Sequence, residues 1–105
     1  MILKDLIEVI KSRKNNEDGQ SYTASLFNEG LQECCKKFGE EAVELIIAAL
    51  QRKDDDLKEE SADLIYHFLV LLEICNVDFN DVLCVLESRM NQSGLKEKSN
   101  RSKNL

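Results

Sequence analysis

The sequence predicts an all-α protein, a bundle of about four to five helices. Proline is absent from the 105 residues and glycine occurs only four times, so few positions interrupt a helix. Apolar residues recur at helical spacing along most of the chain, and no useful stretch alternates as a half-buried strand does. With 43% hydrophobic residues, a chain of this length builds one modest core.

The N-terminal part is predicted to hold two helices. Residues 2–13 place Ile2, Leu6 and Ile10 at amphipathic helical spacing. Residues 15–21, NNEDGQS, are predicted to form a loop. Thr23 is predicted to cap a second helix that includes Leu26, Phe27 and Leu31.

The two longest helices are predicted at about 31–51 and 55–76, joined antiparallel by the polar connector 52–56. Gly30 and Gly39 weaken helix formation and mark sites for a kink or break. An aspartate of the connector is expected to cap the second long helix, whose apolar run LIYHFLVLL makes it the most buried element. The apolar stripe of the first long helix is Leu31, Cys35, Phe38, Ala42, Leu45 and Ala49.

A last helix is expected to start at Asp78 or Asn80 and to run through about 91. Residues 93–105 are polar and without periodicity, so we expect a disordered tail after a helical domain of residues 1–92. Because the apolar faces exceed what one small bundle can cover, the domain is expected to assemble as a homodimer.

Charge and hydropathy exclude two classes of partner. The chain has 14 Lys and Arg against 20 Asp and Glu, and this formal charge of -6 disfavours nucleic acid as a partner. No apolar run is long enough to span a membrane, and the N-terminus has no signal-peptide layout. The cysteines form no CxxC pair, and we expect them to be small buried hydrophobes in a cytoplasmic protein: Cys34, Cys35, Cys75 and Cys84.

Two pairs of carboxylates lie at helical spacing in the two longest predicted helices. Glu41 and Glu44 share one face of the first, and Glu60 and Asp63 share one face of the second. Glu40 lies four residues before Glu44. Carboxylates on facing helices supply the oxygen ligands that Mg²⁺ takes, and bound Mg²⁺ can also contact substrate phosphates. The structural alternative is that the glutamates only favour the helix dipole and form a solvated face.

Further candidate residues flank these acids. Arg13, Lys14 and Lys37 can bind phosphate, although Lys37 and Glu41, four residues apart, can also form an ion pair. The segment Ser21–Thr23 suits either a helix cap or a phosphate at a helix N-terminus. His67, the only histidine, is expected to be a partly buried hydrogen-bonding residue rather than a metal ligand.

The order of these motifs resembles a known family. Arg13-Lys14, a polar loop, SYTASL, a glycine at 30, KKFGEEAVELIIAA and EESADLIYHFLVLL follow one another as in the phosphoribosyl-ATP pyrophosphatase family of histidine biosynthesis. That family belongs to the MazG-like all-α nucleotide pyrophosphohydrolases. The likeness covers about residues 3–90. The loop before SYT often contains proline in relatives, and here it reads NNEDGQ.

The resemblance implies Mg²⁺-dependent hydrolysis of phosphoribosyl-ATP to phosphoribosyl-AMP and pyrophosphate, with Mn²⁺ as a possible substitute. It assigns the metal and the chemistry to Glu41, Glu44, Glu60 and Asp63, with Glu40 as an additional ligand or a holder of water. One of these carboxylates would be the general base. The implied substrate contacts are Arg13, Lys14, Ser21, Tyr22, Thr23, Lys37, Tyr66 and His67.

Two other functions are compatible with the residues. One is a house-cleaning (d)NTP pyrophosphohydrolase on the same scaffold, which needs the four acids but not the SYT segment. The other is a helical interaction module with a solvated acidic face and no catalysis. Many relatives are fused to a cyclohydrolase domain that performs the next step. The chain carries no such domain, so a separate cyclohydrolase is expected to act on the product.

Overall fold

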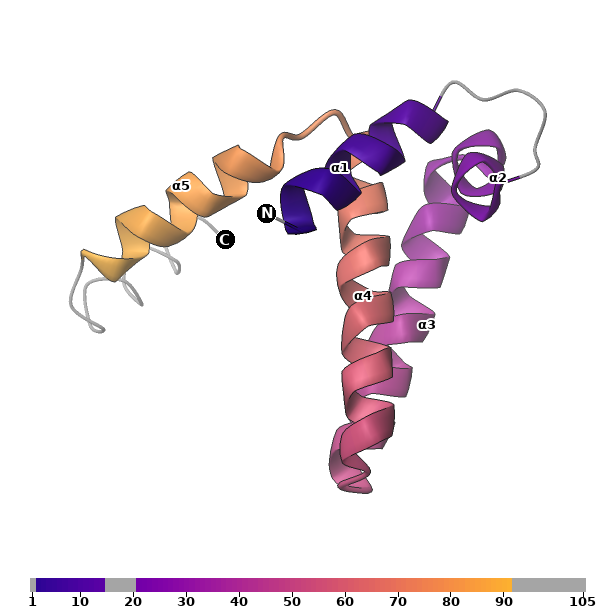
Figure 1. Ribbon diagram of the computed structural model, residues 1–105, viewed down its shortest axis with the longest axis vertical. Helices are drawn as coiled ribbons and strands as arrows, with labels where there is room; N and C mark the ends of the chain where they lie inside the picture. The colour runs from indigo at the N-terminus through magenta and orange to yellow at the C-terminus, as the bar shows by residue number, and fades with distance from the viewer. Residues whose placement is uncertain (1, 15–20, 92–105) are drawn as a thin grey trace.

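A computed structural model describes residues 2–14 and 21–91, which form five α-helices and no strand (Figure 1). The all-α prediction is therefore confirmed for this part of the chain. Residues 15–20 of the predicted loop 15–21 and the predicted tail at 93–105 lie outside the described residues, and the domain boundary at 92 stays a prediction. The helices are α1 (Ile2–Arg13), α2 (Tyr22–Glu29), α3 (Leu31–Leu50), α4 (Asp54–Ile74) and α5 (Phe79–Met90).

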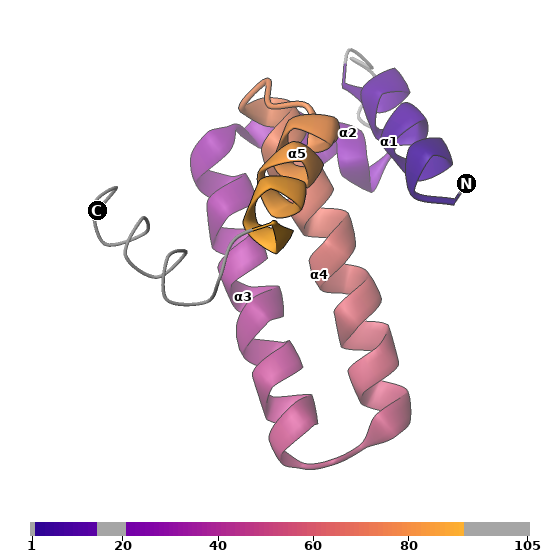
Figure 2. The ribbon, with the colours of Figure 1, turned by 90° about the vertical axis from the view of Figure 1, so that its left-hand side faces the viewer.

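Helices α3 and α4 form an antiparallel hairpin that runs the length of the molecule (Figures 1 and 2). The predicted pairing is confirmed, with a shorter connector than expected, since α3 ends at Leu50 and α4 begins at Asp54. The expected aspartate cap is wrong, because Lys53 is the N-cap and makes no side-chain cap bond. Three aspartates instead occupy the first turn of α4, where they favour the helix dipole: Asp54, Asp55 and Asp56.

A glycine break separates α2 from α3. Gly30 has a φ of 99° and a ψ of -177°, a backbone conformation that side chains disfavour. The predicted break is therefore confirmed at Gly30, whereas the prediction that the second helix includes Leu31 is wrong. No break occurs at Gly39, which lies inside α3. The N-cap of α2 is Ser21, whose Oγ accepts from the Ala24 amide at 3.1 Å. The predicted cap at Thr23 is wrong, because Thr23 lies within the helix and is buried.

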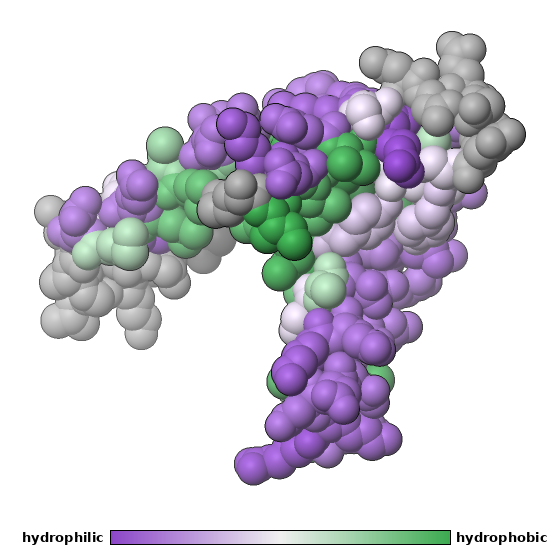
Figure 3. All heavy atoms as spheres, viewed as in Figure 1, coloured by the Kyte–Doolittle hydropathy of each residue, from purple (hydrophilic) through white to green (hydrophobic). Residues whose placement is uncertain are grey.

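Helix α5 leaves the bundle and extends to one side (Figure 1). It begins as predicted, since the Asp78 carboxylate accepts from the Asn80 amide at 2.8 Å. None of its residues is buried. Apolar residues gather along α5 and where it meets α1 (Figure 3). A hollow of about 340 Å³ between these two helices is lined by apolar residues, which include Leu3, Ile7 and Phe79, and by charged and polar residues, which include Lys4 and Glu8.

The core lies where α1, α2, α3 and the C-terminal half of α4 meet, and it consists of Ile10, Leu26, Cys34, Leu69 and Val70. The burial predicted for α4 is confirmed only in that half. The predicted stripe on α3 is partly wrong. Its members Phe38, Ala42 and Leu45 are half-buried, but Leu31, Cys35 and Ala49 are exposed. The buried residues of α3 are instead Cys34 and Ala48, although Phe38 does face α4, where its ring centroid lies 6.1 Å from that of Phe68.

The prediction of buried cysteines holds for one of the four. All four are unpaired, but only Cys34 is buried, and Cys35, Cys75 and Cys84 are exposed. Periodicity identified their helices but not the side of each helix that packs. Among the described residues, no helix combines the length and hydropathy that crossing a bilayer requires.

Candidate functional site

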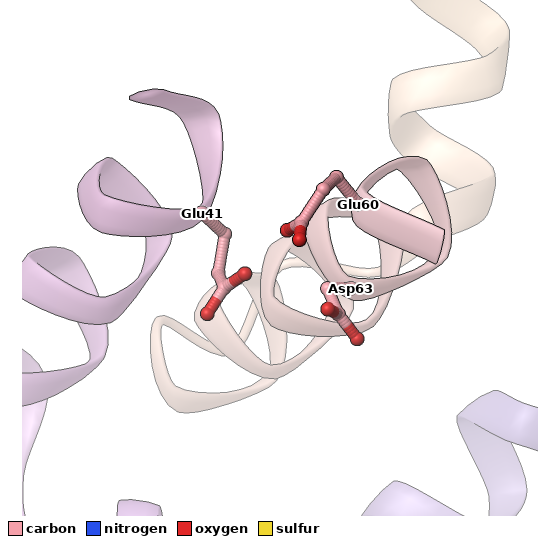
Figure 4. Close-up of side chains that lie close together, drawn as sticks. All are labelled: Glu41, Glu60 and Asp63. Carbon is pink, nitrogen blue, oxygen red and sulfur yellow. The ribbon is translucent and has the colours of Figure 1, made fainter. Parts of the chain in front are cut away.

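Three acids from the two long helices meet midway along the hairpin. Glu41 projects from α3 toward Glu60 and Asp63 of α4 (Figure 4). One carboxylate oxygen from each residue lies within 4.8 Å of the other two. Helical spacing predicted that each pair shares a face, and the antiparallel packing of α3 on α4 turns the faces toward each other. The arrangement is suited to a divalent cation.

Two of these carboxylates are also short of hydrogen-bond donors. Oε2 of Glu41 and Oε2 of Glu60 have almost no accessible surface and no hydrogen-bond partner in the described part of the chain. Buried polar atoms in folded proteins nearly always have a partner, and an unpartnered one costs about 1–3 kcal/mol. The site therefore requires bound protons or a bound cation to offset the crowded negative charge.

The ionisation of the acids reflects this crowding. The pKa of Glu60 is raised from 4.5 to about 7, first by loss of hydration and then by the nearby Glu44 carboxyl and the other negative charges around it. The pKa of Glu41 is also raised, by loss of hydration and by Glu44, while His67 acts in the opposite direction. Both carboxyls hold protons at a pH where an ordinary glutamate has lost its proton. A cation would displace those protons.

Glu44 and Glu40 occupy different surroundings. The Glu44 side chain is exposed, yet its carboxyl lies close enough to Glu41 and Glu60 to raise the pKa of both. It also borders a hollow of about 180 Å³ with Glu60 and Asp56. Asp56 was not predicted to be a site residue, although its position one helical turn before Glu60 was a usable signal. Glu40 is exposed and pairs instead with the Lys37 ammonium at 3.5 Å.

The N-terminus of α2 is held against α4 next to the acids. The Tyr22 hydroxyl lies 3.0 Å from Nε2 of His67, and Nδ1 of His67 lies 2.8 Å from the Asp63 carbonyl. One residue further on, the Thr23 hydroxyl bonds the Tyr66 hydroxyl. The structure thus brings SYT and the YH of α4 together, although 43 to 45 residues separate them.

Comparison with known proteins agrees with this geometry. Residues 3–90 match the family described as Phosphoribosyl-ATP pyrophosphohydrolase. The chain belongs to this family. The phosphoribosyl-ATP pyrophosphatase of Roseobacter denitrificans is 48% identical over 103 residues, 98% of either chain. The proteins of the same name from Parvibaculum lavamentivorans and Agrobacterium fabrum are 48% and 44% identical over 99 residues, covering 94% of this chain and 91% and 92% of their own. The predicted family is confirmed.

The basic residues of this phosphoribosyl-ATP pyrophosphohydrolase family member differ in how near they lie to the acids. Lys37 is close to Tyr22, because the two groups alter each other's pKa. Burial raises the pKa of the Tyr66 hydroxyl, and Arg13 is close enough to oppose that shift.

Lys14 lies at the other end of α4 from the acids. Its ammonium donates to the Glu73 carbonyl at 3.1 Å and to the Asn76 side chain at 3.0 Å. Glu73 is ten residues from Asp63, about 15 Å along a helix. In this conformation the Lys14 ammonium donates a hydrogen bond to a backbone carbonyl in the last turn of α4, which has no partner within the helix. Its predicted contact with substrate stays a prediction.

Proposed function

We propose that Glu41, Glu44, Glu60 and Asp63 hold the Mg²⁺ with which this enzyme works. The chain is a phosphoribosyl-ATP diphosphatase of histidine biosynthesis, which hydrolyses phosphoribosyl-ATP to phosphoribosyl-AMP and pyrophosphate. The observation that supports the metal proposal is the pair of unpartnered carboxylate oxygens, on Glu41 and Glu60, beside Asp63. An all-oxygen donor set suits a hard cation, and Mn²⁺ should substitute for Mg²⁺.

Each group of residues has its own role in the proposed hydrolysis. Bound Mg²⁺ supplies positive charge to both the carboxylates and the substrate phosphates. The oxygen of a water molecule bonds to phosphorus, the α–β phosphoanhydride bond breaks, and pyrophosphate leaves. One of the four carboxylates accepts the proton of that water, as a general base within hydrogen-bond reach must. The Ser21 hydroxyl and the N-terminus of α2, with Lys37 and Arg13 nearby, bind the phosphates.

The metal proposal is tested by isosteric substitutions of the acids. Glu41→Gln and Asp63→Asn should each lower kcat on phosphoribosyl-ATP at least about 100-fold and weaken Mn²⁺ binding in calorimetry at least about tenfold, because each removes one anionic ligand. Glu40→Gln is the matched control and should change Mn²⁺ affinity less than about twofold. Wild-type Mn²⁺ affinity in both acid variants would show that these carboxylates do not bind metal. Turnover of ordinary NTPs, without turnover of phosphoribosyl-ATP, would contradict the substrate.

We also propose that the enzyme is a homodimer. Helix α3 carries a second apolar face whose side chains are 47–79% exposed: Val43, Ile46, Ile47 and Leu50. These residues follow the i, i+3, i+4, i+7 spacing of one helix face. Ala48, five residues after Val43, lies about 140° round the helix and packs on α4 instead. A second copy of the chain, contacted by α5, would cover this face of α3 and the exposed apolar residues of α5.

Two further proposals concern the fate of the product and the compartment in which the enzyme works. We infer that a separate cyclohydrolase takes phosphoribosyl-AMP onward, because relatives of this chain are matched over 91–98% of their own length. Four unpaired cysteines, three of them exposed, fit the reducing cytoplasm. Purified protein should therefore release phosphoribosyl-AMP as its final product. Formation of the ring-opened product would contradict this inference.

A further inference from the structure

We propose that Tyr22 and His67 are a positioning pair, which fixes the first turn of α2 relative to Asp63 and touches neither metal nor substrate. The inference rests on the proposed functions of the acids and of the N-terminus of α2, with its cap Ser21. It changes the role expected for two residues that the resemblance placed among the substrate contacts.

Both ring nitrogens of His67 are already occupied within the chain. Nδ1 faces the Asp63 carbonyl at 2.8 Å, and because a carbonyl only accepts, Nδ1 carries a hydrogen. Nε2 faces the Tyr22 hydroxyl at 3.0 Å. In the neutral ring Nε2 accepts from this hydroxyl, and in the charged ring it donates to it. In neither state does the buried imidazole offer a free nitrogen to a metal or to a water molecule.

A second hydrogen bond lies beside the first and fixes the orientation of α2. Tyr22 bonds His67 while its neighbour Thr23 bonds Tyr66, so consecutive residues of α2 meet consecutive residues of α4. Two adjacent attachment points restrict both the position and the rotation of a helix. The rings also pack, with the Tyr66 and His67 centroids 5.0 Å apart and the Tyr22 and His67 centroids 5.9 Å apart.

Helix α2 depends on such contacts for its position. It has eight residues, fewer than an isolated helix needs to be stable in water. Ser21, which caps it, is the residue before Tyr22, so a shift of Tyr22 moves the cap and the amides of the first turn. His67 lies one helical turn after Asp63 on α4. The pair therefore sets the distance between the proposed phosphate-binding turn and the proposed metal ligands.

The experiment compares the variants Tyr22→Phe, His67→Gln and His67→Phe with the control Asn28→Ala, which removes an exposed polar side chain from the same helix. Each is assayed for kcat/KM on phosphoribosyl-ATP, for Mn²⁺ affinity with the metal alone, and for thermal unfolding. Tyr22→Phe should lower kcat/KM about tenfold, the worth of one hydrogen bond, and change Mn²⁺ affinity less than about twofold. Asn28→Ala should leave both unchanged.

The histidine variants separate positioning from direct chemistry. His67→Gln keeps an acceptor for Tyr22 and should retain kcat/KM to within about tenfold, which replacement of a general base would not allow. The double variant Tyr22→Phe/His67→Phe should be no worse than His67→Phe alone, because the two side chains act through one bond. Additive losses would show instead that Tyr22 contacts the substrate, and would overturn the proposal.

The failure of this inference can be told from the failure of the metal site. A tenfold loss of Mn²⁺ affinity in His67→Gln would make His67 a ligand and overturn the positioning role. Wild-type kcat/KM in Tyr22→Phe would also overturn it, even if His67→Phe failed to fold. Unchanged Mn²⁺ affinity in Glu41→Gln would instead overturn the metal site, and the result for Tyr22 would still be judged on kcat/KM.

Discussion

Replacing Glu41 by glutamine should make the metal-free protein more stable while it disables the enzyme. The substitution keeps the shape of the side chain and removes one of the charges that crowd the seam between α3 and α4. The glutamine amide can also donate a hydrogen bond to a neighbouring carboxylate, which Glu41 cannot do when ionised. A residue whose removal stabilises the fold is retained for function rather than for structure.

The size of the effect follows from the separation of the charges. The acidic oxygens lie within 4.8 Å of one another. At that distance two unit charges repel by about 1 kcal/mol in water and by about 3.5 kcal/mol at an effective dielectric constant of 20. Because Asp63 is exposed, solvent screens much of this repulsion. We expect a net gain of about 1 kcal/mol at pH 8, which raises Tm by roughly 4–8 °C in a domain of this size.

Thermal unfolding of both proteins in EDTA, at pH 5 and pH 8 and one protein concentration, tests the prediction. The folded protein binds protons on Glu41 and Glu60 that the unfolded chain releases near pH 4.5. The stability that Glu60 contributes is therefore fully present below pH 4.5 and is lost as pH rises through about 7. The stability that Glu41 contributes is also present below pH 4.5 and is lost as pH rises through its raised pKa. The advantage of Glu41→Gln should be large at pH 8 and nearly absent at pH 5.

Two results would refute this reasoning. A lower Tm for Glu41→Gln than for wild type at pH 8 in EDTA would show that the carboxylate makes a structural contact. An advantage of equal size at pH 5 and pH 8 would show that charge repulsion is not its cause. Saturating Mg²⁺ should reverse the order of the two proteins, since at 100 times its Kd a ligand adds about 2.7 kcal/mol to the form that binds it.

Three further predictions concern the metal, the helix break and the dimer. Calorimetry of Mg²⁺ binding at pH 7 in buffers of different ionisation enthalpy should detect proton release, because Glu60 has a pKa of about 7, and equal heats in all buffers would contradict this. In urea unfolding, Gly30→Ala should lower the free energy of unfolding by about 1 kcal/mol, because Gly30 has a φ of 99°. Gly39→Ala, with open space around the added Cβ, should raise it by about 0.5–1 kcal/mol. The opposite order of stabilities would disprove both. Ile46→Glu should convert a dimer to a monomer in sedimentation at micromolar concentration while Val9→Glu on α1 does not, and unchanged sedimentation would exclude this face from the interface.

The sequence predicted where the helices lie along the chain better than it predicted which face of each helix packs in the core. Helix positions followed from 3.6-residue periodicity and from local signals such as Asp78, which the structure confirms as a cap. The buried side of α3 was predicted partly wrong because this helix is apolar on two faces, and spacing alone cannot say which one meets α4. The cap of α2 was assigned to Thr23 rather than Ser21 for a related reason. Thr23 forms a tertiary hydrogen bond to Tyr66, which no local pattern reveals.

The candidate site shows the same division. Spacing within each helix predicted that Glu41 and Glu44 share one face and that Glu60 and Asp63 share another. The antiparallel packing of α3 on α4 brings Glu41 close to Glu60 and Asp63. Lys14 was grouped with the phosphate-binding residues because it is basic and follows Arg13. Its bonds to Glu73 and Asn76 depend on how α1 crosses the far end of α4, which is a property of the tertiary fold.

The position of Glu41 and Glu44 on α3 suggests why the protein keeps carboxylates that lower its folding stability. One side of this helix packs on α4 through Ala48, and the other carries the exposed apolar row around Ile46. Glu41 and Glu44 border the side that packs on α4, and Glu44 and Glu60 also line the adjoining hollow. If the acids bind the cation as proposed, this hollow gives a substrate access to it. An acid deeper in the seam would lose that access, and one on the solvated face would lose its partners. Glu40, one position away and paired with Lys37, illustrates the second case.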